Sequence, residues 1–443
     1  MRFLLTPVGS SGDVHPYIAI GRELIARGHE VMLFSAEPHR DVVERSGIEF
    51  VATASAAAYR AVTDDPDLWH PSRGYRTVVR SVIPLLEPAR QDLAARYVPG
   101  RTVLVGHPIA FVTRTFEEQV DAPAATLHLA PSTLRSAYQV PVIPPGVDIS
   151  RLPRWVKRAL WRLIDQALLD RPLAPSLNAW RVTLNLPPVH RVFKDWINSP
   201  RCVIGLFPEW FAARQPDWPD AFHHAAFPLW DDASGAPLDA ELAAFLDAGT
   251  PPVVVSPGSA NSHAAPFFHA AMHALQRLGR RGLFLTGFAE QVPANLPPTI
   301  LFRRYAAFSS VLPRAAALVH HGGIGSMAQA FAAGVPQLIM PMAFDQPDNA
   351  MRAARLGVAQ WLAPKRFTPE RVTAALGLLL GDPAYRDSAL ECRDRLRRDI
   401  ASGRGIRRTC DLLEGLGVLE RAPEHTPEDV PGSRPTEKQV IAG

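Results

Sequence analysis

Cysteine and lysine are both scarce in this chain of 443 residues. The three cysteines, Cys202, Cys392 and Cys410, are too few and too scattered for a disulfide framework or a zinc site. Only four of the 47 basic residues are lysines, which leaves little choice for the Schiff-base lysine of a pyridoxal-phosphate phosphorylase. The sequence has no H-E-x-x-H motif and no P-loop, so nothing in it indicates metal-dependent hydrolysis or nucleoside-triphosphate chemistry.

Excess charge and long apolar runs are missing as well. Basic residues outnumber acidic ones by only 47 to 43, without a long basic run, so the sequence gives no case for nucleic acid as a partner. No apolar run reaches the ~20 residues that would span a bilayer. The N-terminus, MRFLLTPVGSSGD, shows neither a signal-peptide core nor a cleavage site. We therefore expect a cytoplasmic protein, for which a peripheral contact with the inner membrane stays open.

The order of apolar runs and glycine turns predicts an α/β fold. Residues 2–8 form an apolar run, Gly9 to Gly12 form a turn, helical spacing follows Pro16, and a second apolar run lies at 31–34. This order is that of a βαβ unit in a parallel sheet. Further buried strands are expected at 102–105, 124–129, 252–256, 282–286, 299–302, 316–320 and 337–340.

Because the pattern restarts in the second half, it predicts two Rossmann-like, doubly wound domains that face each other. We place the first domain at residues 1–220 and the second at residues 221–395. Residues 396–420 are expected to form a C-terminal helix that packs back on the N-terminal domain. Residues 421–443 are polar and rich in Pro, and we expect them to be a disordered tail.

The most informative stretch is HHGGIGSMAQAFAAGVPQLIMPMAFDQPDNA, residues 320–350. An expected strand delivers His321 into a glycine-rich turn, where an Ala-rich helix begins. Glycines let the backbone approach an anion, and the helix N-terminus presents unpaired N–H groups and a partial positive charge to it. His321 can donate a hydrogen bond to a phosphate oxygen, and Ser326 can add a hydroxyl. The stretch therefore predicts a phosphate-binding site.

Two polar residues follow the next expected strand. Asp345 and Gln346 come after Pro341, at the carboxyl end where open α/β sheets bind ligands. A carboxylate beside a carboxamide suits a ring of sugar hydroxyls. A structural glycine turn and a solvated Asp-Gln pair explain each piece alone, but they do not explain the ordered set. We expect the stretch to bind both phosphate and sugar.

The first turn, GSSGDVHP at residues 9–16, has the spacing G-x-x-G and lacks the third glycine of the dinucleotide fingerprint. Asp13 lies at the tip of this turn, toward the interdomain cleft of such a fold. A carboxylate there can take the proton of an attacking hydroxyl, or it can merely cap the following helix. His15 is a second candidate for the base, although it fits better beside the acceptor.

Two further features have competing interpretations. Asp65-Pro66-Asp67 has the D-x-D form of a metal site, but its surroundings predict a loop at the acceptor mouth. Residues 152–168 put apolar side chains, Trp155 among them, on one helical stripe with arginines off it. We expect this amphipathic helix to pack on the core. The alternative is a lip that touches a membrane or a lipid-like acceptor.

Together these pieces resemble the family 1 glycosyltransferases, which have two facing Rossmann-like domains (the GT-B fold) and use nucleotide-activated sugars. HHGGIGS…AGVP…P…DQPDNA is similar to the family's nucleotide-sugar signature, and GSSGDVHP to the first loop of its bacterial and sterol-modifying branches. The resemblance implies an acceptor-binding N-terminal domain, with Asp13 as the catalytic base, and a nucleotide-sugar-binding C-terminal domain. It implies donor contacts from Ser259, Tyr305, Ala306, His321, Gly323, Gly325, Ser326, Asp345 and Gln346.

Within the family, the stretches DPDLWHP, APSTLRSA, LFPEWFA and FPLWD are similar to the rhamnosyltransferases of rhamnolipid biosynthesis. That resemblance implies an inverting, metal-independent transfer of L-rhamnose from dTDP-L-rhamnose, with no cofactor, to the hydroxyl of a 3-(3-hydroxyalkanoyloxy)alkanoic acid. The product is a mono-rhamnolipid. His15, Trp69 and Trp155 would lie near the acceptor, which an accessory subunit could supply. Tyr305 stands where the family usually has a Trp, and Phe308 where it has a Gln, so the base of the donor is left open.

Three other functions stay open at this point. One is transfer from UDP-glucose or another nucleotide sugar to a sterol or other lipophilic acceptor. Another is a nicotinamide or flavin oxidoreductase, although the third glycine is missing and the stretch from His321 to Gln346 would have no role. The last is a non-catalytic subunit that binds a nucleotide sugar or a lipid.

Overall fold

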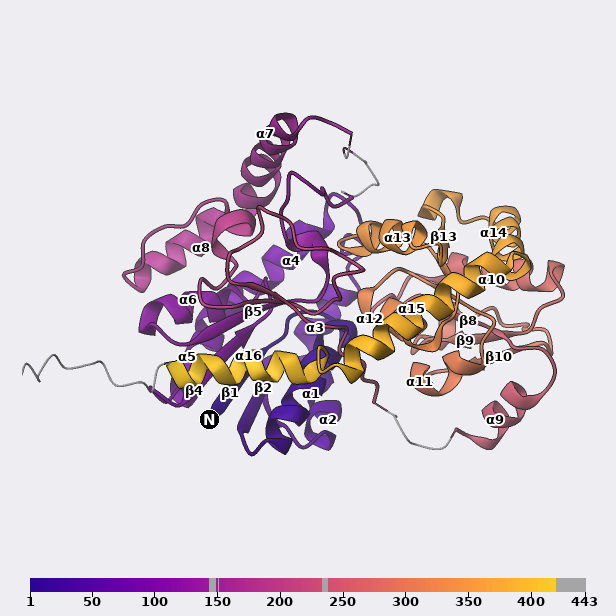
Figure 1. Cartoon of the computed structure of the whole chain (residues 1–443), viewed down its shortest axis with the longest axis horizontal. Coiled ribbons are helices and arrows are strands. Elements are labelled where there is room, and N and C mark those ends of the chain that lie inside the picture. Colours follow the sequence, from indigo (N-terminus) through magenta and orange to yellow (C-terminus); the bar gives the residue numbers. More distant parts are fainter. Residues whose placement is uncertain (143–148, 150, 233–237, 420–443) are drawn as a thin grey trace, which may run out of the picture.

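The computed structural model describes residues 1–142, 149, 151–232 and 238–419, and shows two α/β halves side by side (Figure 1). The apolar runs expected to be strands are strands, with ends shifted by at most two residues. The strands of the first half are β1 (Arg2–Thr6), β2 (Glu30–Ala36), β3 (Glu49–Ala54), β4 (Thr102–Gly106), β5 (Ala124–His128), β6 (Val203–Gly205) and β7 (Phe222–His224). Those of the second half are β8 (Val253–Ser256), β9 (Gly282–Leu285), β10 (Ile300–Arg303), β11 (Ala317–His320), β12 (Gln337–Ile339) and β13 (Ala359–Trp361).

The two halves contain sheets of the same topology. The first sheet has the order β3-β2-β1-β4-β5-β6-β7 and the second the order β10-β9-β8-β11-β12-β13. Every pair of neighbouring strands is parallel. Each sheet therefore has the strand order of a doubly wound fold, in which ligands bind where the order reverses, at the carboxyl ends of the strands. The predicted fold class of two Rossmann-like domains is confirmed.

Helices cover both faces of each sheet, as parallel sheets require. The helices of the first half are α1 (Ser11–Ala26), α2 (Arg40–Arg45), α3 (Ala56–Thr63), α4 (Gly74–Val82), α5 (Leu86–Arg96), α6 (Phe111–Val120), α7 (Arg154–Ile164) and α8 (Arg171–Thr183), with π-helical turns η4 (Asp165–Asp170) and η5 (Val192–Trp196). Those after β7 are α9 (Ala240–Asp247), α10 (Ala265–Arg277), α11 (Phe308–Val311), α12 (Ile324–Ala333), α13 (Gln346–Arg355), α14 (Pro369–Gly381), α15 (Pro383–Ala401) and α16 (Ile406–Leu419).

The end of the described chain returns to the first half. α15 packs on α12 in the second half, and α16 then lies beside α1 (Figure 1). Arg27, which follows α1, pairs with Asp411 at 2.7 Å and with Glu414 at 2.9 Å. The predicted boundary between the domains at residue 220 lies just before β7, although β7 is the last strand of the first sheet. The predicted start of the C-terminal helix at residue 396 lies inside α15. The tail predicted at residues 421–443 lies outside the described residues.

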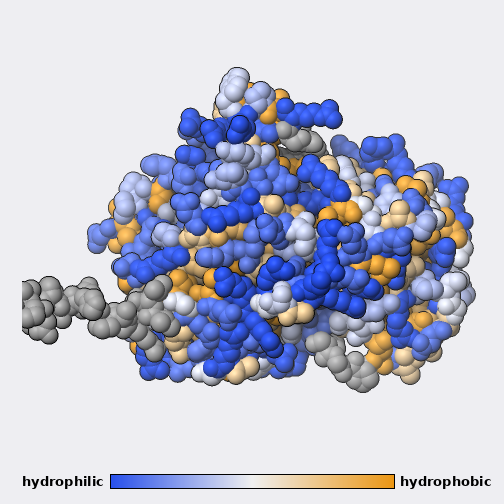
Figure 2. Space-filling model, in the orientation of Figure 1, coloured by the Kyte–Doolittle hydropathy of each residue, from blue (hydrophilic) through white to orange (hydrophobic). Residues whose placement is uncertain are grey.

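α7 departs from what its sequence led us to expect. It projects from the first half (Figure 1), and most of its apolar stripe faces solvent, with Trp155 74% and Leu163 61% exposed, whereas Ile164 is half-buried. Lys157 and Trp161 point inward instead. The expectation that the stripe packs on the core was therefore wrong, because helical spacing defines a stripe but not the side on which the core lies. Figure 2 shows hydrophilic and hydrophobic residues next to each other over this helix; the exposed arginines there are Arg151, Arg154, Arg158 and Arg162.

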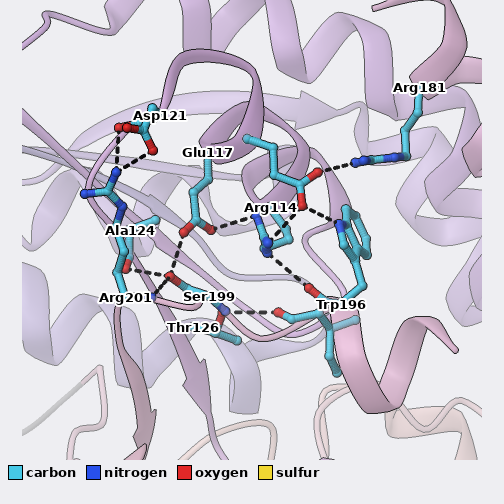
Figure 3. A network of polar contacts seen from close by, with 11 residues as sticks. Arg114, Glu117, Asp121, Ala124, Thr126, Arg181, Trp196, Ser199 and Arg201 are labelled. Carbon is cyan, nitrogen blue, oxygen red and sulfur yellow. Dashed lines mark hydrogen bonds and ion pairs between the residues drawn. The ribbon is translucent and has the colours of Figure 1, made fainter. Parts of the chain in front are cut away.

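A polar network fixes the outer wall of the first half (Figure 3). Arg181 of α8 is buried and forms an ion pair with Glu118 at 2.7 Å. The other carboxylate oxygen of Glu118 accepts a hydrogen bond from the Trp196 indole at 3.0 Å, and Arg114 donates to the Trp196 carbonyl at 3.1 Å. These contacts join α6, α8 and η5. Because η5 also carries Phe193, the network holds one wall of the cavity described below.

None of the described helices has the length and hydropathy of a bilayer-spanning segment.

Candidate active site

A cavity of about 1190 Å³ lies between the two halves, at the carboxyl ends of β1, β8 and β11. These are the positions at which the strand order of each sheet reverses. α1, α12 and α13 all begin at this cavity. A Cβ on Gly325, in the first turn of α12, would lie 3.9 Å from the carbonyl oxygen of Gly12 in α1, so the two helix starts face each other. Their unpaired N–H groups and partial positive charges favour an anion between them.

His321 is held at the start of α12 by two glycines. A Cβ on Gly258 would lie 2.7 Å from the His321 ring, and a Cβ on Gly323 would lie 2.5 Å from it. The Nδ1 atom is buried and has no hydrogen-bond partner among the described residues. Burial lowers the pKa of His321 to about 4, so the ring is neutral at pH 7 and carries one N–H donor. A buried, unsatisfied ring nitrogen beside a helix start fits an anionic ligand.

The other residues expected to contact the donor lie around the same cavity. Ser259 lines it from the loop after β8, and Gly325 and Ser326 line it from the start of α12. Tyr305 and Ala306 line it from the segment after β10, and the Tyr305 side chain is 52% exposed. The structure thus brings together all the residues named from the sequence as donor contacts. Their roles remain a prediction.

Asp345 and Gln346 lie at the start of α13, beside the glycine turn, where a Cβ on Gly322 would lie 3.3 Å from the Cβ of Gln346. Asp345 accepts a hydrogen bond from the Asn349 amide at 2.7 Å, and burial raises its pKa to about 6. The Gln346 side-chain oxygen accepts from the backbone N–H groups of Met342 and Ala343 at 2.8 and 3.2 Å. Only the Gln346 amide N–H groups therefore remain for a ligand. Phe344, just before this pair, has φ of 56°, an uncommon backbone conformation for a residue with a side chain.

The contacts of Asp13 are compatible with both interpretations of the sequence, a cap of α1 and a base, and its role as the base stays a prediction. Its carboxylate accepts from the Ser10 backbone N–H at 2.7 Å and lies 3.3 Å from the Ser10 hydroxyl, which caps α1. It also lines the cavity, and burial raises its pKa to about 7, with a smaller contribution from the charge of Asp345. A Cβ at Gly9 would lie 2.1 Å from the carboxylate, so the first glycine makes room for it. A carboxyl with this pKa can exchange protons near neutral pH.

His15 lines the cavity two residues farther along α1. Its ring contacts Trp230 edge-on, with centroids 4.8 Å apart, and burial lowers its pKa to about 4. Trp230 belongs to the stretch FPLWD, in which we predicted no site residue, and it lines the cavity from the loop after β7. Trp69 also lines the cavity and contacts Phe344 across the two halves, with centroids 6.0 Å apart. Trp155 does not line it, because it lies on the solvent side of α7.

The part of the cavity inside the first half is a chamber with apolar walls. Its side chains come from α4, α5, α6, the inner face of α7, η4 and η5. They include Val78, Val82, Leu86, Ala89, Phe111, Trp161, Ile164, Leu169 and Phe193. An arginine, Arg135, also lies in this wall; it belongs to the stretch APSTLRSA, in which we predicted no site residue. No spacing in the sequence distinguishes these residues from ordinary core residues.

Both aspartates of the D-x-D segment form ion pairs with arginines, of which Arg80 lines the cavity. Asp67 pairs with Arg73 at 3.0 Å and Asp65 with Arg80 at 3.4 Å. Neither aspartate lines the cavity, although Leu68, which follows, does. In the described part of the chain, no group of three or more His, Cys, Asp or Glu side chains is placed to hold a metal ion.

Comparison with known proteins agrees with the fold. The glycosyltransferase family 28 N-terminal domain matches residues 3–139, and the erythromycin biosynthesis protein CIII-like C-terminal domain matches residues 285–402. O-mycaminosyltylonolide 6-deoxyallosyltransferase from Streptomyces fradiae is 31% identical over 451 residues, covering 96% of this chain and 100% of that protein.

Solved structures share the fold at lower identity. The glycosyltransferase of kitacinnamycin covers 94% of this chain and 98% of its own with a TM-score of 0.71 and 22% identity. Spinosyn rhamnosyltransferase SpnG, complexed with thymidine diphosphate, covers 94% of this chain and 100% of its own with a TM-score of 0.67 and 17% identity. All the similar proteins named above are glycosyltransferases or proteins of sugar-transfer families, and none of them is an oxidoreductase. This chain belongs to the GT-B glycosyltransferases and is an enzyme that uses a nucleotide sugar.

Proposed function

We propose that this enzyme transfers L-rhamnose from dTDP-L-rhamnose to the free hydroxyl of a 3-(3-hydroxyalkanoyloxy)alkanoic acid, with inversion and without a metal ion or cofactor. The observation that carries the proposal is the cavity itself, which joins the cluster of helix starts to a chamber with alkyl and aromatic walls. An acceptor with alkyl chains matches such a chamber because each methylene removed from water contributes about 0.8 kcal/mol.

The proposed base is Asp13. It lines the cavity at the start of α1, which faces the start of α12, and its pKa of about 7 lets it accept a proton as the acceptor oxygen attacks the anomeric carbon. The C–O bond to the acceptor forms while the bond to the diphosphate breaks. The acceptor proton moves to the Asp13 carboxylate, and the electron pair leaves with the diphosphate.

The leaving diphosphate would lie at the start of α12. Backbone N–H groups there and the N–H of the neutral His321 ring can stabilise its growing charge, as a metal ion does in other transferases. Asp345 and the Gln346 amide would hold the sugar hydroxyls. Support for a deoxysugar on dTDP comes from similar proteins: one is a 6-deoxyallosyltransferase, and another is a rhamnosyltransferase whose structure holds thymidine diphosphate.

A second acceptor class has an observation in its favour. The 31% identical relative is named for a tylonolide substrate, and one solved structure of the spinosyn rhamnosyltransferase is complexed with spinosyn aglycone. A macrolide ring is also large and apolar. It differs from a hydroxyalkanoyl acid in lacking long flexible alkyl chains and a free carboxylate, and this difference makes the two acceptors separable by experiment.

The delivery of a lipid acceptor is proposed to involve α7. Its outer face carries Trp155 and Leu163 among exposed arginines, while Trp161 and Ile164 on its inner face line the cavity. An apolar ridge with basic neighbours suits a surface of anionic lipid. One helix would thus contact both the inner membrane and the chamber, with or without an accessory subunit that supplies the acceptor.

The test is a matrix of purified donors and acceptors read by mass spectrometry of the products. The donors are dTDP-L-rhamnose, dTDP-glucose and UDP-glucose; the acceptors are a 3-(3-hydroxyalkanoyloxy)alkanoic acid, a macrolide aglycone and a sterol. The proposal expects rhamnose on the hydroxyalkanoyl acid as the main product. If the main product comes from UDP-glucose, or forms on the macrolide or the sterol, the proposed donor or acceptor is wrong and the one that reacts takes its place.

A further inference from the structure

A buried guanidinium lies in the wall of the acceptor chamber. Arg135 comes shortly after β5, and its side chain is only 8% exposed. It lines the cavity together with Tyr75, Trp161 and Phe193. A guanidinium keeps its charge in proteins and carries five N–H donors, so its burial in an apolar wall is costly unless those donors are satisfied.

The partners of Arg135 satisfy it only in part. Its Nη2 lies 3.1 Å from an Asp165 carboxylate oxygen, yet that oxygen has no hydrogen-bond partner among the described residues, so the contact is an ion pair without hydrogen-bond geometry. The other terminal nitrogen, Nη1, is buried and also has no hydrogen-bond partner there. The indole of Trp161 covers the guanidinium, 4.1 Å from its central carbon, and donates its own N–H to the Ser136 carbonyl. One donor direction of Arg135 is therefore left for a ligand.

The neighbouring polar groups do not fill that direction. Both carboxylate oxygens of Asp170 accept backbone hydrogen bonds, from Arg191 at 2.6 Å and Val192 at 3.1 Å. The Tyr75 hydroxyl donates to the Leu169 carbonyl at 2.9 Å. Burial lowers the pKa of Arg135 and raises that of Asp165, since each charge has lost more hydration than its partner replaces. A second carboxylate that bonds to Nη1 would offset part of the desolvation of the Arg135 charge.

We propose that Arg135 binds the free carboxylate of the acceptor, an inference that rests on the proposed function. The acceptor would then be fixed at three points: its hydroxyl at Asp13, its alkyl chains among the chamber walls, and its carboxylate at Nη1 of Arg135. The ligand class is an alkyl chain that ends in a carboxylate. Arg135 is thus a specificity residue that favours free acids over esters, alcohols and uncharged macrocycles.

The experiment compares the free hydroxyalkanoyloxyalkanoic acid with its methyl ester, which removes the charge and keeps the chains and the hydroxyl. The quantity measured is the ratio of kcat/KM for the acid to kcat/KM for the ester. Loss of a charge-assisted hydrogen bond corresponds to roughly a tenfold to hundredfold change, so Arg135→Met should lower this ratio by about that factor. Asp165→Asn removes the competing carboxylate and should keep the ratio or raise it.

The matched control is Arg90→Met. Arg90 is a partly buried arginine on α5 that pairs with Glu87 at 2.7 Å and lies outside the cavity lining. This variant should keep the wild-type ratio. Because Arg135→Met leaves Asp165 without its partner, the double variant Arg135→Met, Asp165→Asn is measured as well, and its ratio should fall like that of Arg135→Met. A fall in both kcat/KM values with an unchanged ratio would show a merely structural role and overturn the inference.

A binding measurement separates this inference from the proposed function. Calorimetry compares the binding of dodecanoate with that of dodecanol, which has a terminal hydroxyl in place of the carboxylate. Neither compound has the 3-hydroxyl that would receive the sugar. Wild-type protein should bind dodecanoate more tightly, and Arg135→Met should lose that preference. If no hydroxyalkanoyl acid is glycosylated, the proposed function fails, and a retained dodecanoate preference still supports the carboxylate site. If transfer occurs but acid and ester react equally well in the wild type, the carboxylate site fails and the proposed function stands.

Discussion

The two ends of the cavity are built in different ways. The donor end is built on helix starts, on glycines that let the ring of His321 lie close, and on the loops after β8, β11 and β12, which carry its few polar side chains. The acceptor end is made of side chains on six separate elements between α4 and η5. A site built on helix starts and loops leaves a compact sequence signature, whereas a chamber of side chains leaves none. The donor chemistry is therefore tied to the fold, and the acceptor chemistry can change with single side chains.

The largest expected effect lies where the two ends meet. Asp13→Asn should lower kcat by at least 10²–10⁴-fold, because the amide cannot take the acceptor proton, while the affinity for dTDP stays within a few-fold. Steady-state kinetics and calorimetry measure the two quantities. Ser10→Ala is the control for the capping role, since it removes a hydroxyl beside Asp13 but keeps the carboxylate. Asp13 is not the base if Asp13→Asn keeps most of its turnover.

His321→Ala should affect the donor end alone. Removing one preorganised donor to a developing oxyanion typically lowers kcat by about 10²–10³-fold. We expect a loss of that size with weaker dTDP binding, and unchanged binding of dodecanoate in the chamber. A variant that loses dodecanoate affinity as well would show that the two ends are not independent.

Ala89→Phe should affect the acceptor end alone. Ala89 lines the chamber from α5 and is 7% exposed, so a phenyl ring there occupies space for an alkyl chain. Mismatches of this kind cost about 1–3 kcal/mol, which predicts a loss of roughly tenfold or more in kcat/KM for long-chain acceptors. Short-chain acceptors and dTDP should be affected little. Equal losses for all chain lengths would place the alkyl chains elsewhere.

The pH dependence tests the environment of Asp13. Because the base must be ionised, kcat/KM should rise about tenfold per pH unit up to the pKa of about 7 and then level off. Burial is the main cause of that pKa, and the charge of Asp345 raises it further. Asp345→Asn should therefore move the rising limb to lower pH, whatever it does to the maximum rate. A limb that moves to higher pH would contradict this arrangement.

The smallest effect is expected at the outer face of α7. Trp155→Ser should weaken binding to vesicles of anionic lipid by several-fold, measured by cosedimentation, because the side chain is 74% exposed on an arginine-rich helix. Transfer to an acceptor dissolved in detergent should not change. Leu378→Ser, at an exposed apolar residue on α14 of the other half, is the control. Equal loss in both variants would remove α7 from the proposal.

The sequence predicts the donor end of the cavity better than it predicts the acceptor chamber. The strand–turn–helix pattern and the stretch from His321 to Gln346 predicted the fold class and the residues at the donor end. Helical spacing could not tell which side of α7 meets the core, and Trp155, which the resemblance implied near the acceptor, does not line the cavity. The stretch APSTLRSA contains Arg135, but no pattern there indicates its role, since that role depends on Asp165 and Trp161, which reach it only in the folded chain.

Four strands, β3, β6, β7 and β13, were not predicted. Three of them have only three residues, and such short segments show a clear pattern only when an apolar run extends beyond them, as it does at β12. The positions of β7 and β13 follow from pairing with β6 and β12, which is a property of the sheet and not of the segment.

A chain-length series probes the match between the chamber and its acceptor without altering the protein. Wild-type enzyme is given dTDP-L-rhamnose and a set of 3-(3-hydroxyalkanoyloxy)alkanoic acids that differ by one methylene at a time, and kcat/KM is measured for each. We expect a rise of up to about fourfold per methylene until the chamber is filled, and then a plateau or a fall. A kcat/KM that does not change with chain length, or faster transfer to a macrolide aglycone than to every member of the series, would contradict the proposed function.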